Sequence, residues 1–183
     1  MTKKIIATSV AMGAMLTLIG CGGGSSSTAT SSVATGTAYY IDSAVEGVDY
    51  TCGARSGVTG ADGSFTFEAG GSCTFYLGDI ELRGVDAGLL VDGESVYETD
   101  VNIARILQSL DSDGNPNNGI TIEAATVQAL ADEGITSLPT SEAEMDEMLA
   151  VIAVNGGTEV SEDDAVEHML TTLLAGEIFY VVD

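Results

Sequence analysis

The chain has 183 residues, 45% of them hydrophobic, with 28 acidic residues against five lysines and arginines. The formal net charge of −23 repels nucleic acid and anionic lipid headgroups, which argues against nucleic-acid binding and against electrostatic docking on a membrane. The length allows one hydrophobic core of ordinary size and does not require two independent domains.

Residues 1–20 have the pattern of a signal peptide. Lys3 and Lys4 precede an apolar run over residues 5–19, which is too short to span a bilayer comfortably. The end of this run, Leu18-Ile19-Gly20-Cys21, resembles the lipobox of bacterial lipoproteins. That resemblance implies removal of the first 20 residues and acylation of Cys21, for example with palmitate, and several acyl chains anchor a protein stably. The alternative is an ordinary secretory signal that happens to end near a cysteine.

Residues 21–36 are the next segment, and after Cys21 they are almost entirely Gly, Ser, Thr and Ala without charge. We expect a flexible tether, with an end-to-end distance of roughly 20 Å over about 15 residues. Positions 22–24 are glycine, and a proteobacterial lipoprotein without aspartate there is usually passed on to the outer membrane. We therefore expect a protein that is lipid-anchored in the outer membrane and faces either the periplasm or the exterior. Without the leader, 28 acidic residues and three arginines remain, a net charge of −25.

The other two cysteines agree with an exported protein. If Cys21 carries lipid, Cys52 and Cys73 remain as an even pair in an oxidising compartment, where disulfides persist. We predict that they are bridged, and closing a loop of about 20 residues would stabilise the fold by about 3 kcal/mol. A metal or redox role is disfavoured because the spacing is not Cys-x-x-Cys and the single histidine lies far along the chain.

Residues 37–96 are expected to be β-rich, because short β-type runs alternate there with Gly and Asp. Asp62-Gly63 is a tight-turn signal, and it feeds a strand in which Phe65 and Phe67 alternate with polar residues. Dense turn signals without a 3.6-residue period predict a small antiparallel sheet or half-sandwich. The runs cover, in chain order, residues 36–41, 45–52, 59–67, 73–77, 80–82 and 89–91.

Three segments of this part, residues 41–48, 57–67 and 70–75, resemble carboxypeptidase-regulatory-like or Cna-B-like β-sandwich modules. The likeness is carried by Ile41-Asp-Ser-Ala-Val-Glu-Gly-Val48 and by the Asp-Gly turn with its two phenylalanines. Modules of that family serve as stalks and binding modules of surface proteins and catalyse nothing. The stretch from Asn102 to Ile120 is also similar to surface lipoproteins of marine gammaproteobacteria. Both resemblances imply a non-catalytic surface protein.

From residue 97 onward the apolar pattern becomes helical. Over residues 100–110 the apolar residues share one face, and Asp100 can cap the helix. Further helices are expected over residues 121–132, from Ser141 and from Ser161, the last two with capping boxes. The expected C-terminal ends are Gly134, Gly156 and Gly176. The side chains expected to face inward are Met145, Met148, Leu149 and Ile152 in the third helix and Val166, Met169, Leu170 and Leu173 in the fourth.

The last residues, 177–183, are β-branched and aromatic and are expected to return to the sheet as a strand. The predicted fold is therefore α+β, with a small antiparallel β-sheet or half-sandwich followed by a helical subdomain of three to four helices and a C-terminal strand. Residues 97–183, the helical part, should pack with the β-rich part as one domain.

One stretch between two expected helices, Asp111-Ser-Asp-Gly-Asn-Pro-Asn-Asn-Gly119, has the composition of a cation-binding loop. Calcium prefers six to eight oxygen ligands. Pro116 and Ile122 stand where an EF-hand has glycine and the closing glutamate, so the loop is no EF-hand. A turn whose side chains satisfy their own backbone is the alternative. The oxygens at alternate positions belong to Asp111, Asp113, Asn115 and Asn117.

No nucleophile elbow, zinc-protease helix, P-loop or dinucleotide fingerprint occurs in the sequence. His168 shares a helix face with Asp164, opposite the apolar stripe of its helix, and is expected to be solvent-exposed. We therefore expect no enzyme. With 28 acidic residues some carboxylate pairs arise by chance, so a glycan-active enzyme ranks last among the alternatives.

The function expected first is a non-catalytic cell-envelope lipoprotein, a surface adhesion or structural module that binds a protein or glycan. The alternative is a periplasm-facing accessory or inhibitor protein that binds another envelope component. Calcium is the one cofactor under consideration, and the membrane is contacted through the lipid anchor.

Overall fold

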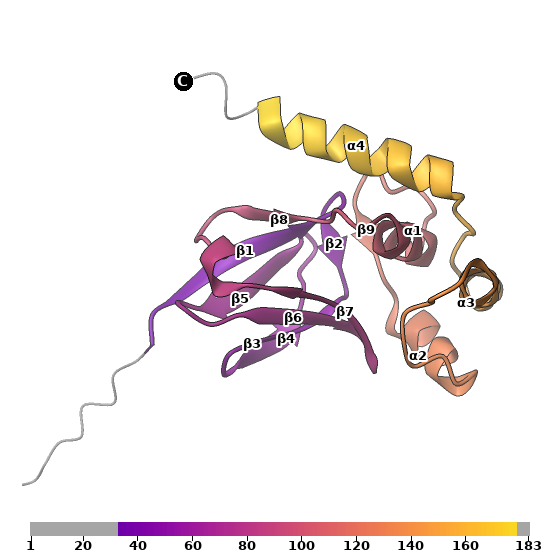
Figure 1. Cartoon of the computed structure of the whole chain (residues 1–183), viewed down its shortest axis with the longest axis horizontal. Coiled ribbons are helices and arrows are strands. Elements are labelled where there is room, and N and C mark those ends of the chain that lie inside the picture. The colour runs from indigo at the N-terminus through magenta and orange to yellow at the C-terminus, as the bar shows by residue number, and fades with distance from the viewer. Residues whose placement is uncertain (1–32, 179–183) are drawn as a thin grey trace, which may run out of the picture. The chain divides into compact units, whose positions relative to one another are not determined.

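The computed structural model describes residues 33–178, in which short strands fill the first part of the chain and helices the second (Figure 1). The strands are β1 Thr35–Ile41, β2 Val45–Glu46, β3 Asp49–Cys52, β4 Arg55–Val58, β5 Ser64–Glu68, β6 Cys73–Leu77, β7 Ile80–Val85, β8 Ser95–Tyr97 and β9 Ile120–Thr121. The helices are α1 Val101–Leu110, α2 Ala124–Asp132, α3 Glu142–Val154 and α4 Glu162–Ile178, with a 3-10 turn at Ala87–Leu89. The fold is α+β, as the sequence predicted.

Two sheets form the β-rich part. In the first, β1 lies between β5, which is antiparallel to it, and β8, which is parallel. The second is antiparallel, with the order β4-β3-β6-β7. Their inner faces meet through aromatic rings, since the ring of Phe75 lies 4.6 Å from that of Tyr40 and 4.9 Å from that of Phe65, measured between centroids. The expected half-sandwich is therefore a sandwich of two layers, and one layer contains a parallel pair.

Alternation of apolar and polar residues produces this interior. In β6 and β5 every second side chain is buried, and these include Phe65 and Phe67, because successive side chains on a strand point to opposite faces. The predicted turn before β5 is present. Gly63 adopts a φ of +77°, and the N–H of Ser64 donates to Asp62 Oδ1 at 3.0 Å. The turn residues thus set the register in which both phenylalanines face inward.

The prediction of a strand at residues 89–91 is wrong. Leu89 is the last residue of the 3-10 turn, and Leu89 and Val91 are exposed at 67% and 53% while Leu90 is buried. One inward side chain anchors the segment without a partner strand. Two strands, β4 and β8, are not predicted by the sequence pattern. The first has no apolar alternation, and the second is short and forms its hydrogen bonds with β1.

The first helix forms as predicted and is the centre of the helical part. Asp100 Oδ1 accepts hydrogen bonds from the backbone N–H groups of Asn102 and Ile103, which caps the helix. Every residue from Ile103 to Leu110 is buried, polar ones included, because α3 and α4 also pack against α1. A helix covered on all sides must satisfy its polar side chains inside the protein.

The second helix starts three residues later than expected, at Ala124. The residues before it form β9, which pairs in parallel with β2, Val45 opposite Ile120 and Glu46 opposite Thr121. This pairing joins the helical part to the β-rich part, and residues 33–178 belong to one compact unit.

The third helix, α3, agrees with the prediction. Ser141 Oγ accepts from the N–H of Glu144 at 3.4 Å, and all four expected side chains are buried. Gly134 and Gly156 follow the ends of α2 and α3 with positive φ, as expected of helix-ending glycines.

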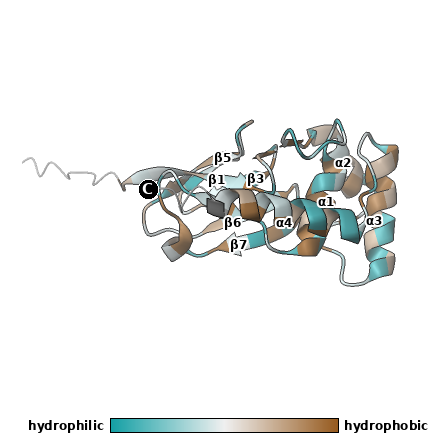
Figure 2. Cartoon of the chain, turned by 90° about the horizontal axis from the view of Figure 1, so that it is seen from above, coloured by the Kyte–Doolittle hydropathy of each residue, from teal (hydrophilic) through white to brown (hydrophobic). Residues whose placement is uncertain are grey.

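The fourth helix differs from the prediction in its end and in its orientation. It runs through Gly176, where an added side chain would collide with Tyr97, so glycine serves close packing here instead of ending the helix. Glu177 and Ile178, expected to begin a strand, are helical, and residues 179–183 lie outside the described residues. Leu170, expected to face inward, is 49% exposed, and the buried positions are Ala165 and Met169. Figure 2 shows apolar residues on the outward side of α4.

Candidate functional site

Polar side chains are buried where α1 passes between the turn that joins β1 to β2 and α4. Gln108 of α1 connects these elements, because its Nε2 donates to Asp42 Oδ2 at 2.9 Å and to the backbone oxygen of Ala165 at 3.3 Å. Both Gln108 and Asp42 are 1% exposed. One amide group therefore bridges the sandwich, α1 and α4.

The only histidine of the chain completes this cluster. His168 Nε2 lies 3.2 Å from Ser43 Oγ, and both side chains are half-buried. The expectation that His168 is solvent-exposed beside Asp164 is wrong, because the orientation of α4 turns this face toward the β1–β2 turn. Asp164 instead accepts a hydrogen bond from Ser161 Oγ at 2.6 Å. Ser43 has a φ of 60°, unusual for a residue with a side chain, so the turn holds it in a sparsely populated conformation.

The carboxyl group of Asp42 is not fully satisfied. Its Oδ1 is buried and has no hydrogen-bond partner among the described residues. Burial raises the pKa of Asp42 from 3.8 to about 6, although the hydrogen bond from Gln108 and the charge of His168 act in the opposite direction. The charge of Glu98 raises the pKa further. This carboxyl group therefore changes its charge in mildly acidic solution.

A second polar network lies beside the first and is completely paired. The hydroxyl of Tyr40 donates to Glu98 Oε2 at 2.5 Å, and Arg83 Nη1 lies 3.3 Å from Glu98 Oε1. The same Oε1 accepts the backbone N–H groups of Thr99 and Asp100, both at 2.8 Å. Burial and the neighbouring Glu98 raise the pKa of the Tyr40 hydroxyl. The network ties β1 and β7 to the start of α1.

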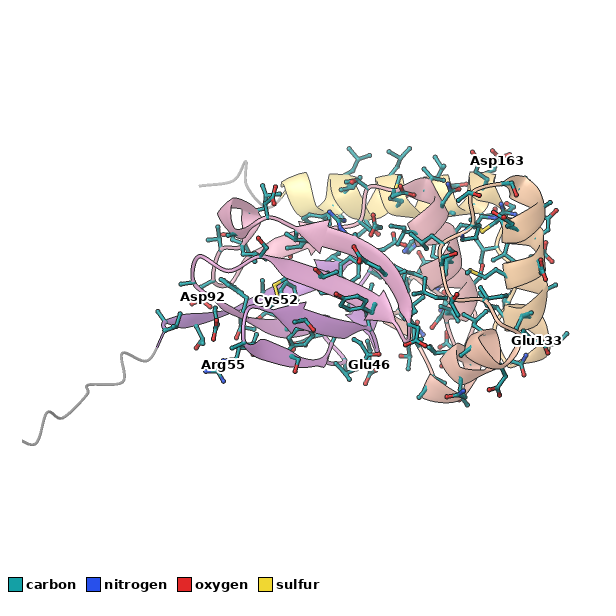
Figure 3. The ribbon with its side chains drawn as sticks, turned by 60° about the horizontal axis from the view of Figure 1, so that its bottom comes forward. Glu46, Cys52, Arg55, Asp92, Glu133 and Asp163 are labelled. Atoms are coloured by element: carbon teal, nitrogen blue, oxygen red, sulfur yellow. A yellow bond between two sulfur atoms is a disulfide. The ribbon has the colours of Figure 1, made fainter. Side chains whose placement is uncertain are left out.

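The arginines make internal contacts more than surface ones. Arg105 is 6% exposed, donates from Nε to the backbone oxygen of Val160 at 2.9 Å and pairs with Glu142 at 2.8 Å. Arg83 is used by Glu98, so Arg55 is the exposed cation of residues 33–178. Figure 3 shows labelled acidic residues on different sides of the molecule, from Glu46 and Asp92 to Glu133 and Asp163. The described surface is consequently anionic almost throughout.

A groove of about 400 Å³ opens next to the cluster. Gln108 and His168 reach it from the cluster, Asp164 and Glu167 from α4, and Asn117 from the Asp/Asn loop. Within the described part of the chain its lining holds carboxylates and no lysine or arginine. Such a lining favours a neutral or cationic group over an anion.

The contact of Ser43 with His168 has the atoms of a nucleophile and a general base. Nucleophilic catalysis also needs a third group that orients the imidazole. Across residues 33–178 the His168 ring hydrogen-bonds to Ser43 alone, and the neighbouring Asp42 carboxylate is bonded to Gln108. The arrangement therefore supports a contact that positions α4 better than a hydrolytic dyad.

In the Asp/Asn loop the carboxylates bond to the loop itself. Asp111 accepts from the backbone N–H groups of Asn115 at 2.8 Å and Thr121 at 2.9 Å. Asp113 accepts from the N–H of Asn115 and from Asn118 Nδ2, both at 2.9 Å. Burial raises the pKa of Asp111, whereas hydrogen bonds from Asn118 and Asn115 lower that of Asp113. This is the geometry of an Asx-rich turn.

The calcium interpretation of this loop stays a prediction. Asn117 Nδ2 donates to Asn115 Oδ1 at 3.4 Å, so the fourth expected ligand faces the third. Among the described residues no three His, Cys, Asp or Glu side chains gather as a metal site would require. The predicted calcium ligands are two aspartates and two asparagines, so they would not form such a group even if the loop bound calcium.

The predicted disulfide is confirmed. Cys52 of β3 and Cys73 of β6 stand opposite each other in the antiparallel register and are bonded (Figure 3). The predicted lipid site, Cys21, lies outside the described residues. In the described part of the chain no helix has the length and apolar character needed to cross a membrane.

Comparison with known proteins identifies no relative. No protein-family model, no curated protein and no solved structure matches the chain.

No local pattern in the sequence predicts the cluster. Asp42, Ser43, Glu98 and Gln108 belong to no catalytic or ligand-binding motif that would distinguish them from other polar residues. One signal was available, because the residues between the apolar positions of α1 include arginine, glutamine and serine in a helix covered by neighbours. Which partners satisfy them depends on residues far away along the chain.

Proposed function

We propose that the protein is an exported lipoprotein of the bacterial cell envelope, acylated on Cys21, whose folded part is a non-catalytic binding or structural module. The observation that carries this proposal is the Leu18-Ile19-Gly20-Cys21 sequence at the end of a signal-type apolar run. Acyl chains on that cysteine hold the protein at a membrane without a spanning helix.

The disulfide supports export. Cys52 and Cys73 are bonded, and such bonds persist in oxidising compartments and are rare in the cytosol. The chain has three cysteines, so Cys21 is the one whose thiol remains for acylation.

Three features support a non-catalytic module. The two-layer sandwich with its Asp62-Gly63 turn agrees with the resemblance to Cna-B-like modules, which bind or support and do not catalyse. The buried polar groups are engaged in contacts between elements, as Gln108 and Glu98 are. The anionic surface suits a protein or glycan partner that presents neutral or cationic groups.

The glycines at positions 22–24, where aspartate is absent, favour the outer membrane as the location of the protein. We place the surface adhesion or structural role first and a periplasm-facing accessory or inhibitor second. Protease treatment of intact cells distinguishes the two, because an outward-facing domain is removed and a periplasmic one is protected.

Metabolic labelling with an alkyne analogue of palmitate tests the anchor. We expect label on the native protein and mass spectra in which residues 1–20 are absent. Cys21→Ser should abolish the label, and the matched variant Ser26→Ala in the tether should retain it. A native protein that keeps residues 1–20 or carries a free Cys21 thiol contradicts the proposal.

A further inference from the structure

The helix α4 packs on α1, but among the described residues it buries fewer apolar side chains than α3 does. Among its described side chains, Ala165 and Met169 are buried, whereas Leu170 and Leu174 are 49% and 60% exposed. Two further apolar side chains, Val166 and Leu173, are half-buried. Polar contacts hold the N-terminal half of the helix, where Gln108 donates to the Ala165 oxygen and His168 contacts Ser43. Because α4 buries few apolar side chains, these polar contacts contribute strongly to its position.

Both attachments lead to the same place. Gln108 holds α4 with the Nε2 group that also donates to Asp42, and Ser43, which contacts His168, is the next residue after Asp42. Asp42 thus lies beneath the attachment points, with one carboxyl oxygen buried and unpartnered. An ionised carboxylate in that position is a buried charge with one oxygen unpaired, whereas the protonated group is neutral and costs less to bury.

The groups that face Asp42 come from each neighbouring element. Tyr40 of β1 and Glu98, with its partner Arg83 of β7, lie on the sandwich side, Gln108 on α1, and His168 on α4. Glu98 opposes a negative charge on Asp42, whereas the Gln108 amide and a protonated His168 favour it. Burial is the largest effect and disfavours the charge.

We propose that a proton on the Asp42 carboxyl group controls how firmly α4 is seated, so that the helix is locked in acid and loosened once the carboxyl group ionises. Removal of the proton places a buried charge beneath the two polar attachments. The least costly relief is for α4 to move away and admit water, because the helix buries fewer apolar side chains than α3 does. The proposal is independent of the acylation of Cys21.

The direction of the pH dependence follows from linkage. The pKa of Asp42 is about 6 in the folded state against 3.8 for an unburied aspartate. A raised carboxyl pKa favours the seated helix fully below pH 3.8, and this stabilisation is lost as the pH rises to about 6. Above that value α4 should be at its loosest.

Hydrogen exchange of the full chain tests the proposal, with protection factors corrected for the intrinsic rate at each pH. Between pH 4.5 and pH 7 the protection of α4 amides should fall on the order of tenfold, because each unit by which a pKa is raised is worth tenfold in the equilibrium. The internal reference is the set of amides that exchange through local openings in which Asp42 stays buried, and these should not show this fall.

Two variants complete the test. Asp42→Asn keeps an oxygen for Gln108 but cannot ionise, so α4 protection should be equal at both pH values. Asp146→Asn removes an exposed carboxylate of α3 and should behave like the wild type. Wild-type protection that does not change with pH, or a change that persists in Asp42→Asn, overturns the proposal.

A measurement on the wild type alone covers the case in which Asp42→Asn does not fold. NMR should show the Asp42 carboxyl carbon and the α4 amides titrating with the same midpoint. Two clearly separate midpoints overturn the proposal.

Discussion

The β-sandwich and the helix α4 belong to one compact unit but are held by different forces. Inside the sandwich, the ring of Phe75 packs against the rings of Tyr40 and Phe65, and a disulfide joins two of its strands. In contrast, α4 buries only Ala165 and Met169 among its described side chains and is also attached through a glutamine and a histidine near a buried carboxyl group. Apolar burial and a covalent bond are insensitive to mild changes of pH, whereas the polar attachment is not. One fold can therefore combine a rigid part with a part that responds to its surroundings.

Removal of an aromatic ring from the sandwich should have the largest effect. Phe75 is fully buried against three other rings, so Phe75→Ala should lower the free energy of unfolding by about 3–5 kcal/mol. Urea denaturation at constant pH measures the change. The control is Leu174→Ala on the outer face of α4, which should cost within about 0.5 kcal/mol. Equal losses for the two variants would show that α4 is held by apolar contacts after all.

Loss of the disulfide should come next. The double variant Cys52→Ser, Cys73→Ser should lower the free energy of unfolding by about 3 kcal/mol, because the unfolded chain regains the freedom of a closed loop. The same urea titration measures it, with reduced wild type as a comparison. Hydrogen exchange of α4 should keep its pH dependence in this variant, and loss of that dependence would argue that the two regions are not separate.

A smaller effect is expected for the residue that bridges the two regions. Gln108→Leu leaves the Asp42 carboxyl group and the Ala165 oxygen without their donor, which should cost about 1–3 kcal/mol. Unlike the sandwich variants, it should release α4 before the sandwich unfolds, as limited proteolysis within α4 would show. Gln128→Leu, at an exposed glutamine of α2, is the control. A Gln108→Leu protein whose α4 resists protease like the wild type would contradict the bridging role.

The smallest effect is expected in the Asp/Asn loop, which lies between the regions. Asp113→Ala should lower the melting temperature slightly, because the bonds from Asn115 and Asn118 are lost. We expect the same loss with added calcium and with chelator, since the loop carboxylates already accept N–H groups. A wild-type melting temperature that rises with calcium, and no longer does so in Asp113→Ala, would establish the calcium site instead.

Local chemistry explains why much of the fold could be predicted. Strand alternation placed Phe65 and Phe67 inward, and the capping side chains of Asp100 and Ser141 marked the starts of α1 and α3. These features involve residues close together in the chain, whose preferences do not depend on the rest of the protein. The strand predicted at residues 89–91 was wrong for a reason that is also local. An apolar run without alternation does not distinguish a strand from an irregular segment with one inward side chain.

The candidate site could not be predicted in the same way. Gln108 bonds to a residue 66 positions away, and His168 contacts one 125 positions away. Neither partner can be chosen from composition or spacing, because many polar residues of the chain would serve. The predicted orientation of α4 was wrong for a related reason. Its apolar residues lie on more than one side of the helix, and packing on α1 selects the side that is buried.

What the sequence by itself determined is the α+β order of elements and the pairing of Cys52 with Cys73. The tertiary structure alone decided which face α4 turns inward, where β8 and β9 find their partners, and that Asp42 is buried beneath a helix from the far end of the chain. The physical reason is that turns, caps and alternation act over a few residues. Burial of a charge, by contrast, depends on everything that the folded chain brings around it.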